Sequence, residues 1–481
     1  MSRDGPMTRA DGEVLPRATT GLPPDHRLLL RARRVTQLAF GSAAERTCSF
    51  RYWNGFAEPG GRAGPNPPTI VIRHPGALRA AFFPPSELAL CEAFVREDLD
   101  VEGDLETVVH FIRDRARYLS AGRLARLASM AARLPPTNGA AADPRSVRRR
   151  WIAARRHTRK RDAAAIRHHY DVGNEFYRLW LDRQSVYSSA YFPPGVDDLD
   201  VAQEEKLDRI CRKLRLGPGE RMLDIGCGWG ALIRYAARHY GVEATGITLS
   251  PSQEAMATRR IVEDGLGEHC RVEIRDYRDL PGRTVFDKVS SVGMFEHVGR
   301  AKLREYFAAA FQALRPGGLL LNSGIIELED ARPASLRARV GRGLRGQGRF
   351  LQRYIFPDGE LLPLAEVVRA AEEEGFETRD VENLREHYMQ TVRHWLRRLQ
   401  AREREAVALA GEARYRAWRL YLAASADAFA RASIGMVELL LSKPRADGTS
   451  EAPSTRDEIY GVRTTAGRMG RPNRAWPRAS G

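Results

Sequence analysis

The sequence predicts an α/β protein in which a mostly parallel sheet follows a small α+β domain. Two observations support this: apolar runs alternate with helix-period segments from residue 220 onward, and a glycine-rich turn separates the first such strand from the first helix. Repeated strand–helix units imply a parallel sheet with helices on both faces. The 481 residues suffice for two or three domains, each with its own core.

Five segments of the second half have the apolar character of buried strands. They are ERMLDIG (220–226), EATGITL (243–249), RVEIRDY (271–277), FDKVSSVG (286–293) and GGLLLNSG (317–324). The segments between them have helical spacing: ALIRYAARHY (231–240), PSQEAMATRRIVEDG (251–265) and AKLREYFAAAFQALR (301–315). A further helix (362–375), a strand (376–384), long helices and a final strand (435–443) complete the predicted domain.

The N-terminal part is predicted to be a separate small unit. CSFRYWNGF (48–56) and PTIVIRH (68–74) alternate like strands, whereas ELALCEAFVRE (87–97) and the end of DVEGDLETVVHFIRD (100–114) read as helices. The predicted boundaries are a disordered N-terminus (1–30), a small α+β domain (31–120), a basic helical linker (121–165), the main α/β domain (166–443) and a disordered tail (444–481).

Composition limits the class of protein. The net charge of +16 predicts attraction to an anionic partner, either a nucleic acid or a phospholipid surface. Five scattered cysteines without a CxxC pair argue against a disulfide framework and a zinc site, and they fit a reducing, cytoplasmic compartment. The N-terminus lacks the apolar segment of a signal peptide, and no run of eighteen apolar residues is long enough to span a bilayer.

Arginine concentrates in three segments: GRLARLASMAARLPP (122–136), RSVRRRWIAARRHTRKR (145–161) and ARPASLRARVGRGLRGQGRFLQRYIFPDG (331–359). The first is predicted to be a basic amphipathic helix. The second is either a solvated helix face or a contact with lipid headgroups or nucleic acid phosphates. The third is either a basic lid beside the site or a surface insertion.

The sharpest motif is LDIGCGWG (223–230), which lies between a predicted strand and a helix. Gly226 and Gly228 permit a tight turn and close approach of the backbone to a ligand, and Gly230 lets the helix pack near the strand. With Asp224 at the strand end, the loop resembles motif I of class I S-adenosylmethionine (SAM)-dependent methyltransferases. A NAD-binding or a purely structural loop is the alternative.

The next two strand ends carry polar groups suited to an adenosine ligand. Thr248, Ser250 and Gln253 can bind a ribose without the charge that NAD folds use there, although Ser250 before Pro251 also suits a helix N-cap. Asp276 and Tyr277 follow the third strand. We expect the carboxylate to bind the adenine amino group and the ring to stack on the base.

The fourth strand ends in SSVGMFEHVG (290–299), which places Glu296 and His297 side by side. Open α/β sheets build their sites at this edge. Glu296 is therefore predicted to be functional, whereas His297 is more typical of a structural residue next to the site. The alternative for the pair is a capping acid beside a surface histidine.

With these residues considered together, the chain resembles the cyclopropane-fatty-acyl-phospholipid synthase family, which includes the mycolic acid methyltransferases. The resemblance covers about residues 45–442 and rests on ordered blocks: HHYDVGNEFYRLWLD, YSSAYF, LDIGCGWG, GITLSPSQ, DYRDL, SVGMFEHVG, YIFPDG, EHYMQTVRHW and YLAASADAF. It implies a Rossmann-like class I methyltransferase sheet, mostly parallel with an antiparallel last strand.

The resemblance also implies an activity: methyl transfer from SAM to a cis double bond of an acyl chain, usually on a membrane phospholipid. In the family, a bound bicarbonate then removes the proton that closes the cyclopropane ring. Glu296 matches the glutamate that orients bicarbonate, Tyr388 matches its tyrosine, and Tyr187 with Ser188 matches a pair near the cofactor.

Three matched positions depart from the family pattern: Ser189 and Ser425 replace cysteines, and Asn322 replaces a histidine. Asn322 can donate a hydrogen bond but cannot carry a proton or a positive charge. We therefore expect methyl transfer to survive while ring closure is in question. The alternatives are a methyl-branched unsaturated product and a non-catalytic lipid-binding homologue.

The expected partners are a phospholipid with an unsaturated acyl chain and the anionic inner face of the membrane, to which the protein binds peripherally, with a homodimer as one possible assembly. No metal is expected. A nucleic-acid methyltransferase is the competing class, but the chain has no Asn-Pro-Pro-Tyr tetrapeptide and no reactive cysteine beside a proline.

Overall fold

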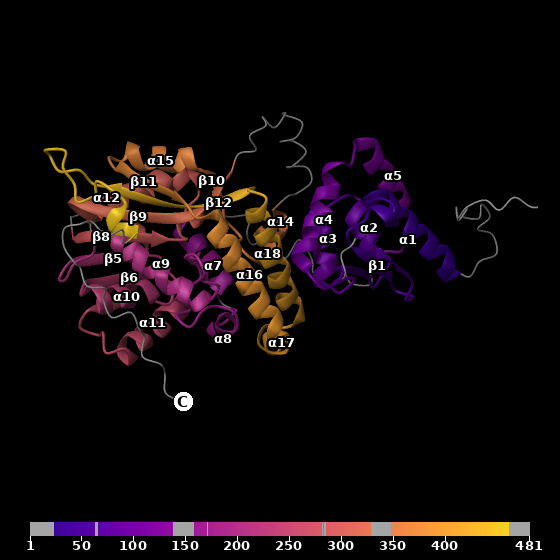
Figure 1. The fold of residues 1–481 in the computed structure, drawn as a ribbon, viewed down its shortest axis with the longest axis horizontal. Helices are drawn as coiled ribbons and strands as arrows, with labels where there is room; N and C mark the ends of the chain where they lie inside the picture. Colours follow the sequence, from indigo (N-terminus) through magenta and orange to yellow (C-terminus); the bar gives the residue numbers. More distant parts are fainter. Residues whose placement is uncertain are drawn as a thin grey trace, which may run out of the picture.

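The computed structural model describes residues 24–62, 66–137, 158–170, 172–280, 282, 285–328 and 348–460. Figure 1 shows two bodies: a small N-terminal domain and a larger domain built on a central sheet, with the long helices α16 and α18 facing the small domain. The Arg-dense segment 145–157 and most of the predicted basic lid, residues 329–347, lie outside the described residues.

The N-terminal domain combines helices with a four-stranded sheet of order β2-β1-β3-β4, in which β1 and β3 are parallel and the other pairs antiparallel. Its elements are α1 (Pro24–Phe40), η1 (Ala43–Glu45), β1 (Ser49–Tyr52), β2 (Ala57–Glu58), β3 (Thr69–Ile72), α2 (Gly76–Phe82), α3 (Glu87–Val95), β4 (Leu99–Glu102), α4 (Leu105–Arg117) and α5 (Ala121–Ala131). Local signals fix some ends: Asp104 caps α4 by accepting from the backbone of Glu106 and Thr107.

The structure corrects the predicted limits of this domain. Helix α1 begins at Pro24, so the predicted disorder does not extend over residues 24–30. Helix α5 has the predicted amphipathic character, but it packs on α1 and α2 and buries Leu127 and Ala131 in their core. It therefore belongs to the small domain and not to a linker.

The large domain has an eight-stranded sheet that confirms the predicted fold class. The strand order is β11-β12-β9-β8-β5-β6-β7, and the short β10 pairs with β9. β5 to β9 run parallel, whereas β12 lies between β9 and β11 and is antiparallel to both. The strands are β5 (Arg221–Ile225), β6 (Glu243–Thr248), β7 (Cys270–Ile274), β8 (Phe286–Val292), β9 (Leu314–Glu327), β10 (Leu362–Pro363), β11 (Glu377–Asn383) and β12 (Ile434–Ser442).

Helices cover both faces of this sheet, as expected for repeated strand–helix units. They are α7 (Arg159–Tyr170), α8 (Asn174–Arg178), α9 (Leu199–Lys213), α10 (Ala231–Tyr240), α11 (Pro251–Glu263), η2 (Tyr277–Asp279), η3 (Phe295–His297), η4 (Arg300–Lys302), α12 (Leu303–Ala313), α14 (Arg349–Tyr354), α15 (Leu364–Glu373), α16 (Arg385–Ala401), α17 (Glu403–Ala410), α18 (Glu412–Ala430) and α19 (Asp457–Tyr460).

Helix α7 shows where the large domain begins. Both Nε and Nη2 of the Arg161 guanidinium donate to Asp358, at 2.6 and 2.7 Å, and Asp162 accepts from Arg278 at 2.9 Å. The predicted linker (121–165) is therefore divided between the two domains, since α5 packs on one and α7 on the other.

The two domains meet through a buried polar interface on α18. Arg416, which is 3% exposed, donates to the carbonyls of Phe94 and Leu99 and pairs with Asp100. Asp427, further along α18, accepts from His110 at 2.8 Å. These contacts explain why α18 lies against the small domain in Figure 1.

The predicted disordered tail is ordered over residues 444–460, which we call the C-terminal strap. Glu451 of the strap accepts from the buried Lys288 at 2.8 Å, and Ile459 is 2% exposed. These long-range contacts stabilise a segment whose Pro- and Gly-containing sequence gives no local signal of order. Residues 461–481 lie outside the described part of the chain.

All five cysteines are free thiols. Across the residues that the structure covers, no helix is long and apolar enough to cross a bilayer, and no group of three or more acidic, histidine or cysteine side chains is arranged to hold a metal ion.

Candidate active site

A cleft lies at the carboxyl ends of β5, β6 and β8, the edge at which parallel sheets bind ligands. We call it the glycine-loop cleft. Its lining consists of Ile166, Ile225, Gly226, Gly228, Ile247, Thr248, Leu249, Gln253, Arg275, Tyr277, Gly293, Met294 and His297. Five of the sequence-predicted cofactor positions (Gly226, Gly228, Thr248, Gln253 and Tyr277) thus lie in one place, together with His297.

The glycine loop has the geometry that its sequence predicts. Gly226, Gly228 and Gly230 have φ angles of +82°, +54° and +78°, which residues with a Cβ rarely adopt. A Cβ on Gly226 would lie 2.9 Å from Met294 Cγ, and one on Gly228 would enter open space. The loop therefore leaves backbone exposed to the cleft, where a ligand can approach closely.

The second and third strand ends supply the predicted polar groups. Thr248 Oγ1 donates to Gln253 Oε1 at 2.8 Å, so both side chains form one wall of the cleft. Ser250 is the N-cap of α11 and accepts from the Gln253 backbone, as its position before Pro251 predicts. Ser250 therefore shapes this wall as a capping residue.

Asp276 and Tyr277 differ in their availability to a ligand. Arg278 donates to Asp276 from its backbone and from Nε and Nη2. Burial raises the pKa of Asp276, but the Arg278 hydrogen bonds outweigh it and bring the pKa below its ordinary value. Tyr277 lines the cleft and packs edge-on against Tyr306 at 5.5 Å. Adenine binding by the Asp276 carboxylate stays a prediction.

An asparagine joins the segment before α8 to the glycine loop. Gly173 has a φ of +101°, and Asn174 begins α8 directly after it. Asn174 Oδ1 accepts from Trp229 Nε1 at 2.9 Å and from Ser252 Oγ at 3.1 Å. The turn is therefore fixed over the loop and the start of α11.

A buried polar cluster underlies the loop of residues 186–188. Lys206 Nζ donates to Ser188 Oγ at 3.1 Å, and Gln203 donates to the carbonyl of Ser188 at 3.0 Å. Burial lowers the pKa of Lys206 to about 8 and raises that of Asp224, which accepts from Ser290 at 2.6 Å, to about 6. The predicted residues Ser188 and Asp224 thus belong to one network below the cleft, and Lys206 completes it.

Glu296 lies on η3 directly after β8 and is buried. Its Oε1 accepts from the Ile325 backbone at 2.6 Å, whereas Oε2 has no hydrogen-bond partner in the described protein. Burial raises the pKa of Glu296 to about 7. A Cβ on Gly324 would lie 2.3 Å from Phe295 Cε1 and 2.8 Å from Glu296 Oε1, so the absence of a side chain at Gly324 makes room for both the ring and the carboxyl group.

Asn322 points to the same face of β9 as Gly324, because side chains two residues apart in a strand share a face. Its Oδ1 accepts from Tyr306 Oη at 2.7 Å, and its buried Nδ2 has no partner among the described residues. Burial is the largest cause of the raised pKa of Tyr306, and the charge of Glu296 raises it further. Glu296 and Asn322 therefore present an acceptor and a donor in one buried region.

Phenol groups connect this region to α16 and α18. The Tyr187 hydroxyl lies 3.4 Å from that of Tyr421. Burial raises the pKa of Tyr421, hydrogen bonds from Tyr187 and Ser425 oppose this, and Glu296 adds to it. Ser425 thus forms a hydrogen bond with Tyr421, which lies one turn earlier on α18. Tyr388 packs against Trp395 and Phe429, at centroid distances of 5.9 and 4.7 Å.

The place of Ser189 in an anion site stays a prediction, and its hydroxyl makes a local contact. Its Oγ donates to the carbonyl of Ala190 at 3.0 Å, and the side chain is buried. Phe176 and Tyr177 are buried core residues packed around Trp180 and Trp418.

Sequence reasoning missed several residues of the site. His297 lines the cleft, although its pattern favoured a structural role, and its ring contacts Phe356 at 5.6 Å. Phe356 stacks on His169 at 4.3 Å and contacts Tyr421. The matched block YIFPDG contained Phe356, and that block was the available signal.

Comparison with known proteins identifies the family and the fold. The family model described as mycolic acid cyclopropane synthetase matches residues 157–439. The chain belongs to this family. A "Probable fatty acid methyltransferase" from Pseudomonas putida is 41% identical over 399 residues, which cover 82% of this chain and 93% of that protein.

The cyclopropane-fatty-acyl-phospholipid synthase of Escherichia coli K12 is 35% identical over 286 residues, covering 60% of this chain and 69% of that protein. The crystal structure of mycolic acid cyclopropane synthase CmaA1 with SAH and CTAB matches with a TM-score of 0.54 and 32% identity, over 58% of this chain and 98% of that one. The chain is therefore a SAM-dependent lipid methyltransferase of the cyclopropane synthase family, with the predicted class I methyltransferase fold.

The residues of the glycine-loop cleft fit SAM. The open space at Gly228 leaves the backbone accessible to the ligand, and the Thr248–Gln253 pair offers uncharged polar groups. Tyr277 offers an aromatic surface in the same cleft. When bound, SAM supplies an electrophilic methyl group.

Proposed function

We propose that this protein methylates the cis double bond of an unsaturated acyl chain on a membrane phospholipid and closes a cyclopropane ring, with bicarbonate held between Glu296 and Asn322. One observation carries the proposal: a buried carboxylate oxygen and a buried amide NH₂ group both lack hydrogen-bond partners in the described structure. Buried polar groups are almost always paired, so an unpaired acceptor on η3 and an unpaired donor on β9 in one buried region support a bound ligand.

Bicarbonate matches both groups chemically. Its hydroxyl can donate to Glu296 Oε2, and its oxygens can accept from Asn322 Nδ2. The Tyr306 hydroxyl donates a hydrogen bond to Asn322 Oδ1 and so fixes the orientation of the amide. Nδ2 is then the amide group that can bind the ligand. Asparagine thus retains the donor function for which the family uses histidine, although it cannot carry a proton itself.

Glu296 controls the pH at which this arrangement works. Its ionised form accepts the hydrogen bond of the anion, whereas its protonated form competes as a donor. Burial raises its pKa to about 7, so the accepting form is fully populated only above that pH. We therefore expect ring closure to decline as the pH falls below 7.

The aromatic side chains around the cleft exclude water and offer π faces. Phe356 and Tyr187 both contact Tyr421 of α18, and the charge of Glu296 contributes to the raised pKa of that tyrosine. An alkene is a weak nucleophile, so a dry site that aligns it with the donor provides most of the available acceleration. The faces of these rings also stabilise the positive charge that develops on the acyl chain.

The excess of positive charge, +16 over the chain, supports a substrate at an anionic surface. We place the enzyme in the cytoplasm, peripherally at the inner face of the membrane, where phospholipids with unsaturated chains are accessible. Vesicle binding should weaken as the salt concentration rises, because counterions screen the surface charge.

A deuterium experiment tests the reaction. The purified full-length protein is incubated with SAM carrying a trideuterated methyl group and with vesicles of monounsaturated anionic phospholipid, and the fatty acids are analysed by mass spectrometry. Cyclopropane formation removes one deuteron from the added methyl, so the product keeps two deuterium atoms. A methyl-branched alkene, formed by loss of a chain proton, keeps all three.

We expect the product that keeps two deuterium atoms. Its yield should fall in buffer freed of carbon dioxide and should recover when bicarbonate is added. Glu296→Gln should abolish ring formation, whereas the exposed Glu243→Gln is the matched control and should not. A product with three deuterium atoms would overturn ring closure. Binding of SAM without any label in the lipid would overturn the whole proposal in favour of a lipid-binding protein.

A further inference from the structure

The C-terminal strap (444–460) lies beyond the segment that the family model matches, which ends at residue 439. It is nevertheless fixed to the large domain at several points. Glu451 binds Lys288 at 2.8 Å, Arg456 binds Asp380 of β11, and the carbonyl of Ile459 accepts from Arg212 of α9. These contacts bring the end of the strap against α9.

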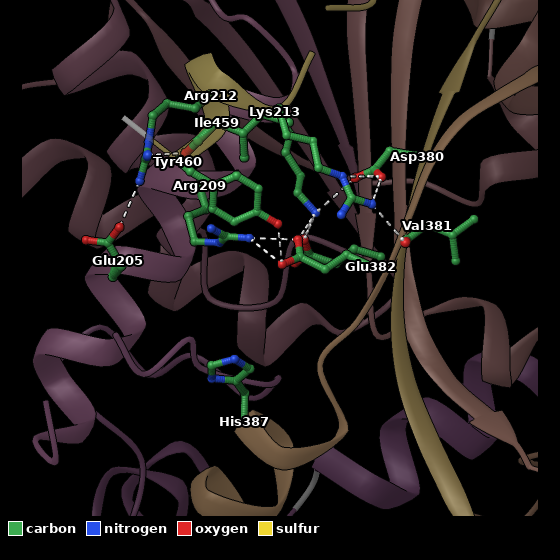
Figure 2. Close-up of polar contacts among 12 residues, drawn as sticks. Glu205, Arg209, Arg212, Lys213, Asp380, Val381, Glu382, His387, Ile459 and Tyr460 are labelled. Atoms are coloured by element: carbon green, nitrogen blue, oxygen red, sulfur yellow. Dashed lines mark hydrogen bonds and ion pairs between the residues drawn. The ribbon is translucent and has the colours of Figure 1, made fainter. Parts of the chain in front are cut away.

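Tyr460, the last described residue, completes a binding site for one arginine (Figure 2). Arg209 of α9 is 3% exposed, and its guanidinium lies 3.7 Å from the ring centroid of Tyr191 and 4.8 Å from that of Tyr460. Its Nη2 donates to both carboxylate oxygens of Glu382, at 2.7 and 2.8 Å, and the Tyr460 hydroxyl donates to the same carboxylate.

Glu382 does not depend on Arg209 alone for its charge balance. Lys213 Nζ lies 2.6 Å from a Glu382 oxygen and 2.6 Å from one of Glu438. A second cation therefore compensates these two acids. Contact with the Tyr191 ring is the feature that distinguishes Arg209 from Lys213.

Tyr191 links Arg209 to the helix that carries Tyr388. Its ring stacks on His387 at 4.3 Å with an interplanar angle of 21°. His387 Nδ1 accepts from the Phe192 backbone at 3.0 Å, and Tyr388, the predicted bicarbonate ligand, follows His387 on α16. The loop that carries Ser189 is thus held against the helix that carries Tyr388.

A second hydrogen bond holds the same loop. The Ala190 backbone donates to Thr391 Oγ1 at 3.0 Å, and Thr391 donates to the His387 carbonyl at 2.7 Å. The position of loop residues 189–192 therefore depends on the positions of His387 and Thr391. Arg209 contacts this loop through the ring of Tyr191.

We propose that Arg209 and Tyr460 are positioning residues: the strap presses the Arg209 guanidinium onto Tyr191, which holds loop 189–192 and α16 in the register that the methyl-transfer site needs. The inference rests on the proposed function for its kinetic readout only. The strap lies outside the segment that the family model matches, so the family match does not itself assign this device.

The charge of Arg209 favours the same arrangement. Nδ1 of His387 must stay unprotonated to accept from Phe192. Burial is the largest cause of the lowered pKa of His387, and the charge of Arg209 lowers it further. The carboxylates of Glu382 on β11, Glu386 on α16 and Glu438 on β12 raise this pKa but do not outweigh the two lowering effects. Arg209 thus supports the loop by ring contact and also by keeping the histidine neutral.

Full-length variants separate ring contact from hydrogen bonding. Tyr460→Phe keeps the aromatic face and loses only the hydroxyl bond to Glu382, whereas Tyr460→Ala removes the face. Arg209→Lys keeps the charge without the planar group. Tyr118→Ala, at an exposed tyrosine of the small domain, is the matched control.

Two measurements are made on each variant. Hydrogen exchange followed by mass spectrometry reports the protection of the peptide that spans residues 186–193 without any assay of activity. Steady-state kinetics with vesicles reports kcat, and calorimetry reports the affinity for SAM.

We expect Tyr460→Ala and Arg209→Lys to raise exchange in that peptide while the other strands keep their protection. For both variants kcat should fall roughly five- to tenfold, the size of a lost cation–π contact. SAM affinity should stay within about twofold, since the glycine-loop cleft does not include these residues. Tyr460→Phe and Tyr118→Ala should behave like the wild type.

Wild-type exchange and wild-type kcat in Tyr460→Ala would overturn the positioning role. Increased exchange throughout the large domain would also overturn it, because that result indicates general destabilisation. A wild-type protein that methylates no lipid refutes the proposed function instead, and the local exchange measurement still tests the positioning role.

Discussion

Replacing Glu296 by glutamine tests the active site through stability as well as through activity. The carboxyl group is buried with one unpaired oxygen, and its pKa is raised from 4.5 to about 7. Between these two values the unfolded chain has released a proton that the folded protein retains, so stability falls as the pH rises. The contribution of the retained proton to the free energy of unfolding is fully present below pH 4.5. It is lost once the pH has risen through 7.

The two pKa values give the size of the effect. A shift of about 2.5 units corresponds to roughly 3 kcal/mol at high pH, of which about 2.5 kcal/mol develops between pH 5 and pH 8. Glutamine keeps an oxygen for the Ile325 backbone but does not ionise. The difference in unfolding free energy between Glu296→Gln and the wild type should therefore shift in favour of the variant by that amount.

Urea unfolding of both proteins at pH 5 and pH 8 measures this difference. Other acids with raised pKa values, such as Asp224, titrate in both proteins and cancel. Glu243→Gln, at an exposed position, controls for the loss of one negative charge. A Glu296→Gln variant that follows the wild type at both pH values would refute the argument that this carboxyl group is buried and unpaired.

Three further substitutions test other parts of the structure. Gly226→Ala should lower SAM affinity at least roughly tenfold in calorimetry, because the new Cβ meets Met294 at 2.9 Å and the backbone has a φ of +82°. Asn322→Leu should shift the labelled product from two to three deuterium atoms, since it removes the donor to the anion. Arg416→Met should lower the free energy of unfolding by about 3 kcal/mol, because its buried hydrogen bonds join the two domains.

Matched control variants are available for Gly226→Ala and Arg416→Met. Gly267→Ala enters open space and should leave SAM affinity unchanged. Arg414→Met changes an exposed arginine on the same helix as Arg416 and should leave stability unchanged. Equal losses in Arg414→Met and Arg416→Met would contradict the interface argument, and an unchanged product from Asn322→Leu would contradict the role of its amide.

The sheet and the glycine loop could be predicted because their signals are local. Alternating strand and helix periods, three glycines after a strand and Ser250 before Pro251 each depend on neighbouring residues only. The order of the strap could not be predicted, because it depends on partners far along the chain, such as Lys288 for Glu451. The place of α5 was missed for the same reason, since an amphipathic helix does not indicate which surface covers its apolar face.

The site shows the same division. Glu296 and Asn322 could be predicted because they follow or lie within recognisable strands. The family block SVGMFEHVG also includes Glu296, and Asn322 stands at a position that the resemblance matches. Lys206 and Arg209 gave no signal: charged residues on a helix ordinarily face water, yet both are about 3% exposed on α9. Only the folded arrangement, with acids from other elements beside α9, makes their burial possible.

Gly324 shows how the cost of the buried carboxylate is built into the sequence. Any side chain there would meet Phe295 Cε1 at 2.3 Å and Glu296 Oε1 at 2.8 Å, so the strand gives up a packing group to make room for a destabilising acid. A protein selected for stability alone would fill this space with apolar atoms. Asn322, on the same face of β9, also has a buried amide Nδ2 without a partner among the described residues, and under the proposed function an anion joins the two groups. Under that proposal, asparagine in place of the histidine that the family resemblance implies is less severe than the loss of Gly324 or Glu296 would be, since the amide retains a hydrogen-bond donor for the anion.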